Sequence, residues 1–223
     1  MTVKTASILA LSLCLQLGVA AAEKVRVSSD TASEKLLEQV QAELIDQAAP
    51  ETEFEARRQA RQAAERIENY LNSKAYFAPE ISYAVEPGEA PVPLVRVEPG
   101  PLFTIGALTT DLSDAASSDQ ASQALADVLT LQAGDIAEPS AVIAQEAGLI
   151  AALQSAGYAD AKALERAMLG DRDAGTLDIT YHIEPGPRIV LGEVIYPSDT
   201  RTRRLYIDRL VPFEAGTVYS PTA

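Results

Sequence analysis

Apolar positions recur along the chain in a fixed order, first at helical and then at strand spacing. A short alternating segment at residues 24–27 is followed by helical stretches around 36–45 and 54–71. Two alternating runs then flank the turn sequence P-G-E-A-P at 87–91, which predicts two strands in a hairpin. The alternating positions of these strands are Ile81, Tyr83, Val85, Val95 and Val97. The predicted order is therefore β-α-α-β-β.

The second helical stretch has two faces of different chemistry. Its predicted apolar face is Phe54, Ala60, Ala63, Ala64, Ile67, Tyr70 and Leu71. Its other face carries Arg57, Arg58, Arg61, Glu65 and Glu68. A helix with one apolar stripe and one charged stripe packs on a core and leaves the charged side in water.

The same order of elements returns between residues 102 and 186. A strand is predicted at Phe103, Ile105 and Ala107, and helices follow around 125–129 and 142–153. Pro139 fits the first turn of the second helix, and Gly157 fits the left-handed residue that ends it. Strands are predicted at 161–168 and 176–183, around the turn sequence G-D-R-D-A-G.

A third pass begins near Arg188 and stops at residue 223. A strand is predicted at 189–196 and a helix at 205–210. The final Pro221-Thr222-Ala223 matches Pro139-Ser140-Ala141, where the second helix of the preceding pass starts. We therefore expect the sequence to be a fragment that ends inside a third unit.

Direct sequence matches support this internal repeat. V-R-V-E-P-G-P-L-F-T-I-G at 95–106 resembles Y-H-I-E-P-G-P-R-I-V-L-G at 181–192, an offset of 86 residues. L-N-S-K-A-Y at 71–76 resembles L-Q-S-A-G-Y at 153–158, at an offset of 82. A-G-D-I-A-E-P-S-A at 133–141 resembles A-G-T-V-Y-S-P-T-A at 215–223, again at 82. Three matches in one order indicate units of about 80 residues.

The first 22 residues have the three parts of a secretory signal peptide. Lys4 precedes an apolar run from Ile8 to Val19, and Ala20-Ala21-Ala22 offers small residues at a cleavage site before Glu23. The alternative is a buried N-terminal helix. Cleavage would remove Cys14 and leave a cysteine-free chain, which must be held by packing rather than disulfides.

Charge and composition exclude several classes of function. The chain has 18 Lys and Arg against 32 Asp and Glu, which argues against a nucleic-acid partner. A single His and a single Cys cannot form a four-ligand zinc site. The acidic stretches at Asp111, Asp114 and Asp119 and at Asp171 and Asp173 lack the ligand order of a calcium loop. We predict no metal, no cofactor and no enzymatic activity; the alternative enzyme would be a hydrolase with paired carboxylates.

The repeated unit resembles the polypeptide-transport-associated (POTRA) domain. The resemblance is carried by the helix ending in Leu153, Gly157 and Tyr158 and by two boundary motifs. These motifs are Glu98-Pro99-Gly100-Pro101 and Glu184-Pro185-Gly186-Pro187. The first unit departs from the pattern, since Ala75 replaces the glycine before Tyr76. A signal peptide followed by such units is similar to the bacterial outer-membrane assembly factors, and most of all to their TamA subfamily.

The resemblance implies an α+β fold of tandem POTRA domains, each with a three-stranded mixed sheet covered by two helices. It implies a signal peptide at 1–22, a first domain at 23–101, a second at 102–186 and the start of a third at 187–223. An outer-membrane barrel would follow beyond residue 223. The expected location is the outer membrane, with this segment in the periplasm. The expected partners are unfolded outer-membrane and autotransporter proteins and an inner-membrane-anchored TamB-like protein.

The resemblance also points to the second strand of each unit as a sheet edge. An edge strand has unpaired backbone groups to which an extended client can add as a further strand. The candidate polypeptide-binding residues are Ile81, Tyr83, Val85, Ala161, Ala163 and Leu164. The E-P-G-P motifs are expected to set the direction of one sheet relative to the next. Two alternatives stay open: simply solvated edges, and a periplasmic scaffold module without a barrel.

Overall fold

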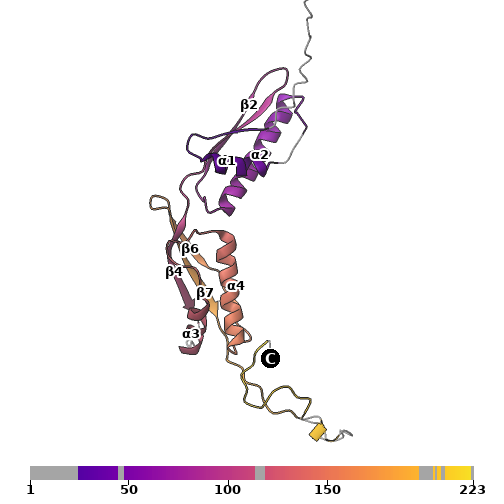
Figure 1. The fold of residues 1–223 in the computed structure, drawn as a ribbon, viewed down its shortest axis with the longest axis vertical. Coiled ribbons are helices and arrows are strands. Elements are labelled where there is room, and N and C mark those ends of the chain that lie inside the picture. Colours follow the sequence, from indigo (N-terminus) through magenta and orange to yellow (C-terminus); the bar gives the residue numbers. More distant parts are fainter. Residues whose placement is uncertain are drawn as a thin grey trace, which may run out of the picture.

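The computed structural model describes residues 25–44, 48–113, 119–195, 203, 205–206 and 209–221. The predicted signal peptide and Asp114 lie outside these residues. Figure 1 shows two sheets, each with its own helices, following one another along an elongated chain. None of the helices in the described part is long and apolar enough to cross a membrane.

The first sheet contains three strands in the order β1-β3-β2. Its strands are β1 (Arg26–Ser28), β2 (Glu80–Glu86) and β3 (Val92–Glu98). The β1–β3 pair is parallel and the β2–β3 pair is antiparallel, so the sheet is mixed. Because β3 is central, β2 lies at one edge of the sheet and β1 at the other.

Two helices cover one face of this sheet. Helix α1 (Glu34–Ala42) begins where the Ser33 side chain accepts the Leu36 N–H, and α2 (Glu53–Ser73) begins where Thr52 accepts the Glu55 N–H. Such caps satisfy backbone donors that have no partner within the helix. The buried residues of this layer form one apolar core: Leu36, Val40, Ala63, Ala64, Ile67, Leu71, Val95 and Val97.

The second sheet repeats this plan with a longer first strand. Its strands are β4 (Thr104–Leu112), β5 (Lys162–Ala163), β6 (Ala167–Asp171) and β7 (Thr176–Glu184). Strand β7 is central, parallel to β4 and antiparallel to β5 and β6. Helices α3 (Asp119–Val128) and α4 (Pro139–Ser155) cover one face. The α+β fold class, with two mixed sheets each covered by two helices, is confirmed.

Four details differ from the sequence predictions. Phe54 is 78% exposed, because it lies a third of a turn away from the buried line of α2, and Ile143 is 54% exposed on α4. The strand predicted at 161–168 is divided into β5 and β6. The strand predicted at 189–196 is reduced, within 189–195, to a single bridge between Val190 and Val218. Of the helix predicted at 205–210, residues 205 and 206 are helical and 209 and 210 form a turn, while 207 and 208 lie outside the described residues.

Candidate polypeptide-binding edges and the joints beside them

Within the described part of the chain, no strand pairs with the outer edge of β2. In its antiparallel register with β3, Val85 lies opposite Pro93. Proline has no N–H, so this cannot be a pair that exchanges two N–H···O bonds. Hydrogen-bonded and non-hydrogen-bonded pairs alternate along such a ladder. Ile81, Tyr83 and Val85 therefore direct their N–H and C=O groups away from β3, toward the free edge.

The side chains of these three residues lie on the helix-covered face of the sheet. Tyr83 is opposite Val95 and Ile81 is opposite Val97, and both valines are 1% exposed. Cross-strand partners share one face, so Tyr83 points the same way but remains 46% exposed at the rim. The edge thus offers backbone hydrogen bonds beside an aromatic ring.

The corresponding edge of the second sheet is interrupted. Between Ala163 and Ala167 the edge strand advances four residues, whereas its partner β7 advances only three, from Ile183 to Thr180. One extra residue in one strand is a bulge, which breaks the ladder and is a common way of protecting an edge.

The residues predicted for this second edge have different surroundings. Leu164 already donates its N–H to the His182 carbonyl at 2.8 Å, and Ala161 donates to the Tyr158 carbonyl at 3.0 Å. Ala161 is also buried in the core, outside any strand. Only Ala163, which alternates with Leu164, directs its N–H outward.

Met168 ends the strand predicted at 161–168 but was not among the candidate binding residues, and its backbone faces the same edge. It lies opposite Ile179 in β7, in a pair that alternates with the hydrogen-bonded ones, and its side chain is 57% exposed. Nearby, Arg166 and Glu146 form an ion pair at 3.6 Å between this edge and α4. The sequence signal for Met168 was an apolar residue at the end of the predicted strand.

The first joint, the segment at Phe103 and Ile105 after the first E-P-G-P motif, is held by backbone hydrogen bonds, one of which reaches back to the first unit. The Phe103 N–H donates to Ala75 at 2.9 Å, and the Phe103 carbonyl accepts from Ala137 at 3.0 Å. The next pair of bonds joins Ile105 to Asp135 and Gly134, both at 2.8 Å. The Phe103 ring meets the Phe77 ring edge-on, with centroids 5.5 Å apart.

The same bonds recur at the end of the second sheet. Ile189 donates to Gly157 at 2.8 Å and accepts from Tyr219 at 3.1 Å. Leu191 donates to Thr217 at 2.8 Å and accepts from Gly216 at 2.7 Å. Each residue has a counterpart in the first joint. Ile189 and Leu191 correspond to Phe103 and Ile105 at the offset of 86, and their partners correspond at the offset of 82. The two joints therefore share one backbone geometry.

Both E-P-G-P motifs contain a glycine in the left-handed region. Gly100 has φ +71° and Gly186 has φ +69°. A Cβ on Gly100 would lie 2.7 Å from the Ala78 carbonyl oxygen, and one on Gly186 would lie 3.2 Å from the Cβ of Asp160. Only glycine suits this conformation and this close approach. The glutamates are anchored differently, since Glu184 pairs with Lys162 at 3.0 Å.

Glu98 instead holds the loop that follows β1. Its carboxylate accepts bonds from the Thr31 hydroxyl, the Asp30 N–H at 3.1 Å and the Ser29 hydroxyl at 3.4 Å. The Thr31 hydrogen bond, followed by the Asp30 N–H, lowers the pKa of Glu98 below its ordinary value of 4.5. Hydrogen bonds to the charged form stabilise that form.

This pKa shift gives an acid-dependent prediction. A lowered folded-state pKa contributes stability above the unfolded value, and this contribution is lost as the pH falls through the folded pKa. We expect the 29–31 loop to loosen on acidification, and Thr31→Val to raise the pKa of Glu98. NMR titration of the Glu98 carboxyl carbon measures both effects. Thr109→Val, in the other sheet, is the control; an unchanged Glu98 titration in Thr31→Val would contradict the expectation.

Among the described residues of α3 and α4, which cover the second sheet, Gln145 is polar and buried. The sequence did not single it out. Its Oε1 accepts from the Thr130 N–H and hydroxyl, both at 2.8 Å, and from the Leu131 N–H at 3.2 Å. Its Nε2 donates to the Val128 carbonyl at 2.9 Å. Gln145 thereby ties the end of α3 to α4. The signal was a glutamine at helical spacing from Val142, Leu149 and Leu153.

Tyr181 lies in the centre of this core. It is fully buried, and its hydroxyl donates to the Val142 carbonyl at 3.0 Å. Burial raises the pKa of Tyr181 to about 12, with Glu146 adding to the shift. The hydroxyl is therefore a neutral structural donor at ordinary pH.

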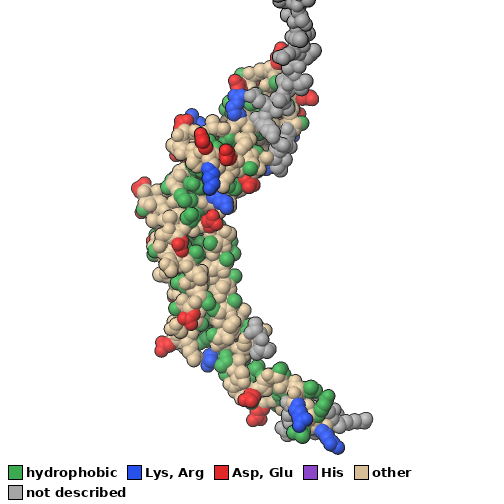
Figure 2. Space-filling view, viewed as in Figure 1, with side chains coloured by type: hydrophobic (Ala, Val, Ile, Leu, Met, Phe, Trp, Pro, Cys, Tyr) green, Lys and Arg blue, Asp and Glu red, His purple; other side chains and the backbone are tan. Residues whose placement is uncertain are grey.

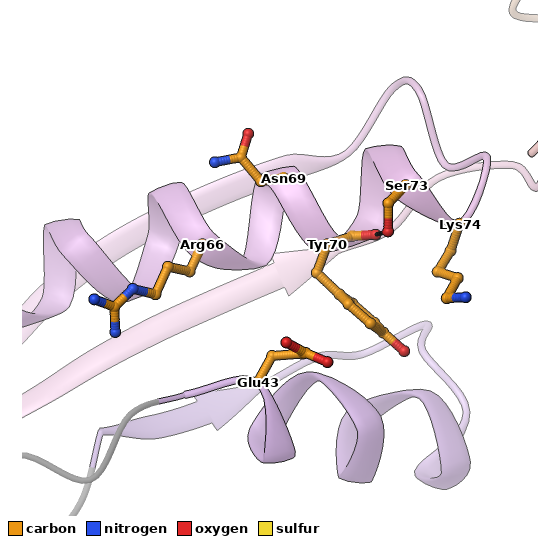
Figure 3. A pocket seen from close by; sticks show the side chains of 6 residues that line it. All are labelled: Glu43, Arg66, Asn69, Tyr70, Ser73 and Lys74. Carbon is orange, nitrogen blue, oxygen red and sulfur yellow. Dashed lines mark hydrogen bonds between the residues drawn. The ribbon is translucent and has the colours of Figure 1, made fainter. Parts of the chain in front are cut away.

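Elsewhere the described side chains do not converge on a catalytic arrangement. An open hollow of about 510 Å³ lies between α1 and α2. Of the residues that line it, Arg66 points away from Glu43, and the Ser73 hydroxyl donates to the Tyr70 carbonyl at 2.7 Å (Figure 3). His182 pairs with Asp111 at 3.1 Å. Asp171 accepts the N–H groups of Asp173 and Ala174 and so closes a turn. Within the described ranges, no group of three or more potential metal ligands occurs.

Comparisons with known proteins give structural neighbours only. No protein-family model and no curated protein matches the chain. POTRA domains 3–5 of BamA from Haemophilus influenzae align with 90% of this chain and 81% of their own, at 16% identity and a TM-score of 0.44. The N-terminal domain of Omp85 from Thermosynechococcus elongatus aligns with 89% and 80%, at 18% identity and 0.43. POTRA domains 1–3 of Omp85 from Anabaena align with 89% and 79%, at 17% identity and 0.45.

Proposed function

We propose that this chain is the periplasmic arm of an outer-membrane protein assembly factor. Residues 23–101 and 102–186 would form two POTRA domains and 187–223 would begin a third. The E-P-G-P motifs, the recurring joint and the β-α-α-β-β order support this assignment. The observation that carries the function is the β2 edge, where three consecutive outward positions offer N–H and C=O groups.

An edge of this kind binds extended polypeptide through the backbone. A client strand can pair with Ile81, Tyr83 and Val85, and main-chain bonds give affinity that tolerates different client sequences. The chemistry requires no catalytic group and no cofactor. The clients we propose are unfolded outer-membrane and autotransporter proteins. A TamB-like inner-membrane-anchored partner would use the same mode of binding if the chain belongs to the TamA subfamily.

The β2 edge is the better binding edge of the two. It continues without interruption for seven residues, whereas the second edge is divided by a bulge and its Leu164 N–H is already bonded. Uninterrupted edges are the ones at risk of pairing with other chains. We therefore assign client binding to β2 and treat the β5–β6 edge, with Ala163 and Met168, as a weaker site.

Proline substitution at Tyr83 tests this proposal. The Tyr83 N–H points outward, so Tyr83→Pro removes a donor for the client while the β2–β3 bonds remain. We expect binding of a fluorescent extended peptide to weaken about tenfold or more, since a bond is lost and the ring obstructs the added strand. Fluorescence anisotropy measures the affinity, and circular dichroism checks the fold.

Two control variants separate binding from folding. Tyr83→Ala keeps the N–H and should bind far better than Tyr83→Pro. Ser82→Pro removes a bond within the β2–β3 ladder and should destabilise the hairpin instead. Unchanged peptide affinity in a folded Tyr83→Pro protein would refute the assignment of β2.

A further inference from the structure

Helix α2 has two flanks, and only one of them faces helix α1. Gln59 donates to the Ala48 carbonyl at 3.0 Å, and Arg66 and Tyr70 line the hollow beside Glu43, the residue that follows α1 (Figure 3). These three α2 residues lie on the same flank at 100° per residue. Because α1 contacts β1, at the other edge of the sheet, the opposite flank of α2 lies on the β2 side.

Charges on this β2-side flank change sign along the helix. After the exposed Glu53 at the start of the helix, Arg57 and Arg61 follow, and Glu65 and Glu68 come one to three turns later. The last four are all exposed and lie within a quarter turn of one another around the helix. Arg61 and Glu65 form an i,i+4 ion pair at 3.8 Å; within the described part of the chain, Arg57 and Glu68 have no ion-pair partner.

The direction of α2 relative to β2 places each charge beside a different end of the edge. Helix α2 ends at Ser73, and β2 starts at Glu80 after a short loop, so the two elements run in opposite directions (Figure 1). Glu65 and Glu68 therefore lie toward the Ile81 end of β2. Arg57 and Arg61 lie toward the Val85 end, near the hairpin.

We propose that this charge order fixes the direction in which an extended segment adds to β2. The proposal rests on strand addition at this edge, which supplies the backbone bonds. Backbone pairing alone allows either direction, whereas exposed ion pairs with α2 distinguish them. The preferred occupant carries acidic residues at the end beside Arg57 and Arg61 and basic residues at the end beside Glu65 and Glu68. Opposite charges attract and like charges repel, so both ends select the same direction.

A peptide with a charge at each end tests the direction. The probe is the nine-residue peptide EVEVTVKVK, with a spin label at the glutamate end or at the lysine end, added to the full chain. We expect the glutamate-end label to broaden the NMR signals of Val85 and Glu86 and the lysine-end label to broaden those of Ile81. The preference should be on the order of tenfold in population, because several exposed pairs act together. It should shrink in 0.5 M salt, where such pairs are screened, while binding persists.

A charge-swapped helix is the decisive variant. Arg57→Glu and Arg61→Glu, combined with Glu65→Lys and Glu68→Lys, keep the net charge and the i,i+4 attraction between positions 61 and 65. This variant should reverse the pattern of broadening. Glu43→Arg with Arg66→Glu, on the α1-facing flank, is the matched control and should leave the direction unchanged.

The outcomes separate this proposal from the proposed function. If the peptide binds, Tyr83→Pro weakens binding as expected and the swapped helix does not reverse the broadening, then strand addition stands and charge-set direction is wrong. If Tyr83→Pro leaves binding intact, or the peptide does not bind at all, strand addition at β2 is itself wrong.

Discussion

Replacing Gly100 with alanine is expected to destabilise the chain by about 2–5 kcal/mol. The residue has φ +71°, a conformation that costs an alanine about 1–2 kcal/mol. The added Cβ would also lie 2.7 Å from the Ala78 carbonyl oxygen, a backbone atom that cannot move without its loop, and overpacking costs about 1–3 kcal/mol. Because Ala78 packs against the second core, the damage should centre on the joint.

Urea unfolding measures the loss in stability, and amide exchange locates it. The Phe103 N–H, which bonds Ala75 across the joint, should exchange faster in Gly100→Ala. Gly148→Ala is the matched control, since a Cβ there meets nothing within 4 Å and alanine favours the helix. We expect that control to be neutral or slightly stabilising. An equal stability of both variants would show that the joint does not depend on the glycine.

The sequence predicted that the glycines of the two E-P-G-P motifs form turns, and both have positive φ. It did not predict the conformation of Ala75. Ala75 has φ +65°, the same left-handed conformation as Gly157 at φ +100° in the second joint. An alanine rarely adopts it, so sequence alone suggested a weaker match. The conformation is held by surrounding bonds: Tyr76 donates to Leu71, and Phe103 donates to the Ala75 carbonyl. Tertiary context has here overcome a local preference.

The two edges show a similar contrast. Strand β2 follows strict alternation, so its bounds and its outward residues could be predicted. The second edge could not, because K-A-L-E-R-A-M has no sharp alternation and a bulge is set by pairing with β7. The placement of Phe54 on the buried face of α2 was wrong for a related reason. It was assigned from hydrophobicity alone, whereas its angular position around the helix puts it on the exposed side.

Among substitutions in the helices that cover the second sheet, we expect Gln145→Met to cause the largest loss of folding stability. Methionine has nearly the shape of glutamine, so packing is largely retained. It removes the acceptor used by the Thr130 N–H, the Thr130 hydroxyl and the Leu131 N–H, and the donor used by the Val128 carbonyl. Partly buried groups left without partners cost about 1–3 kcal/mol each when water cannot reach them. Since Thr130 is exposed, we expect a total loss of about 2–3 kcal/mol.

Gln123→Met is the matched control for this substitution. Gln123 is exposed on α3, and its one hydrogen bond within the described residues is to Asp127, at 2.7 Å, so its loss should stay within about 0.5 kcal/mol. Urea unfolding compares the two variants, and faster amide exchange at Leu131 would place the defect at the end of α3. Equal stability of the two variants would mean that water replaces the Gln145 amide at no cost.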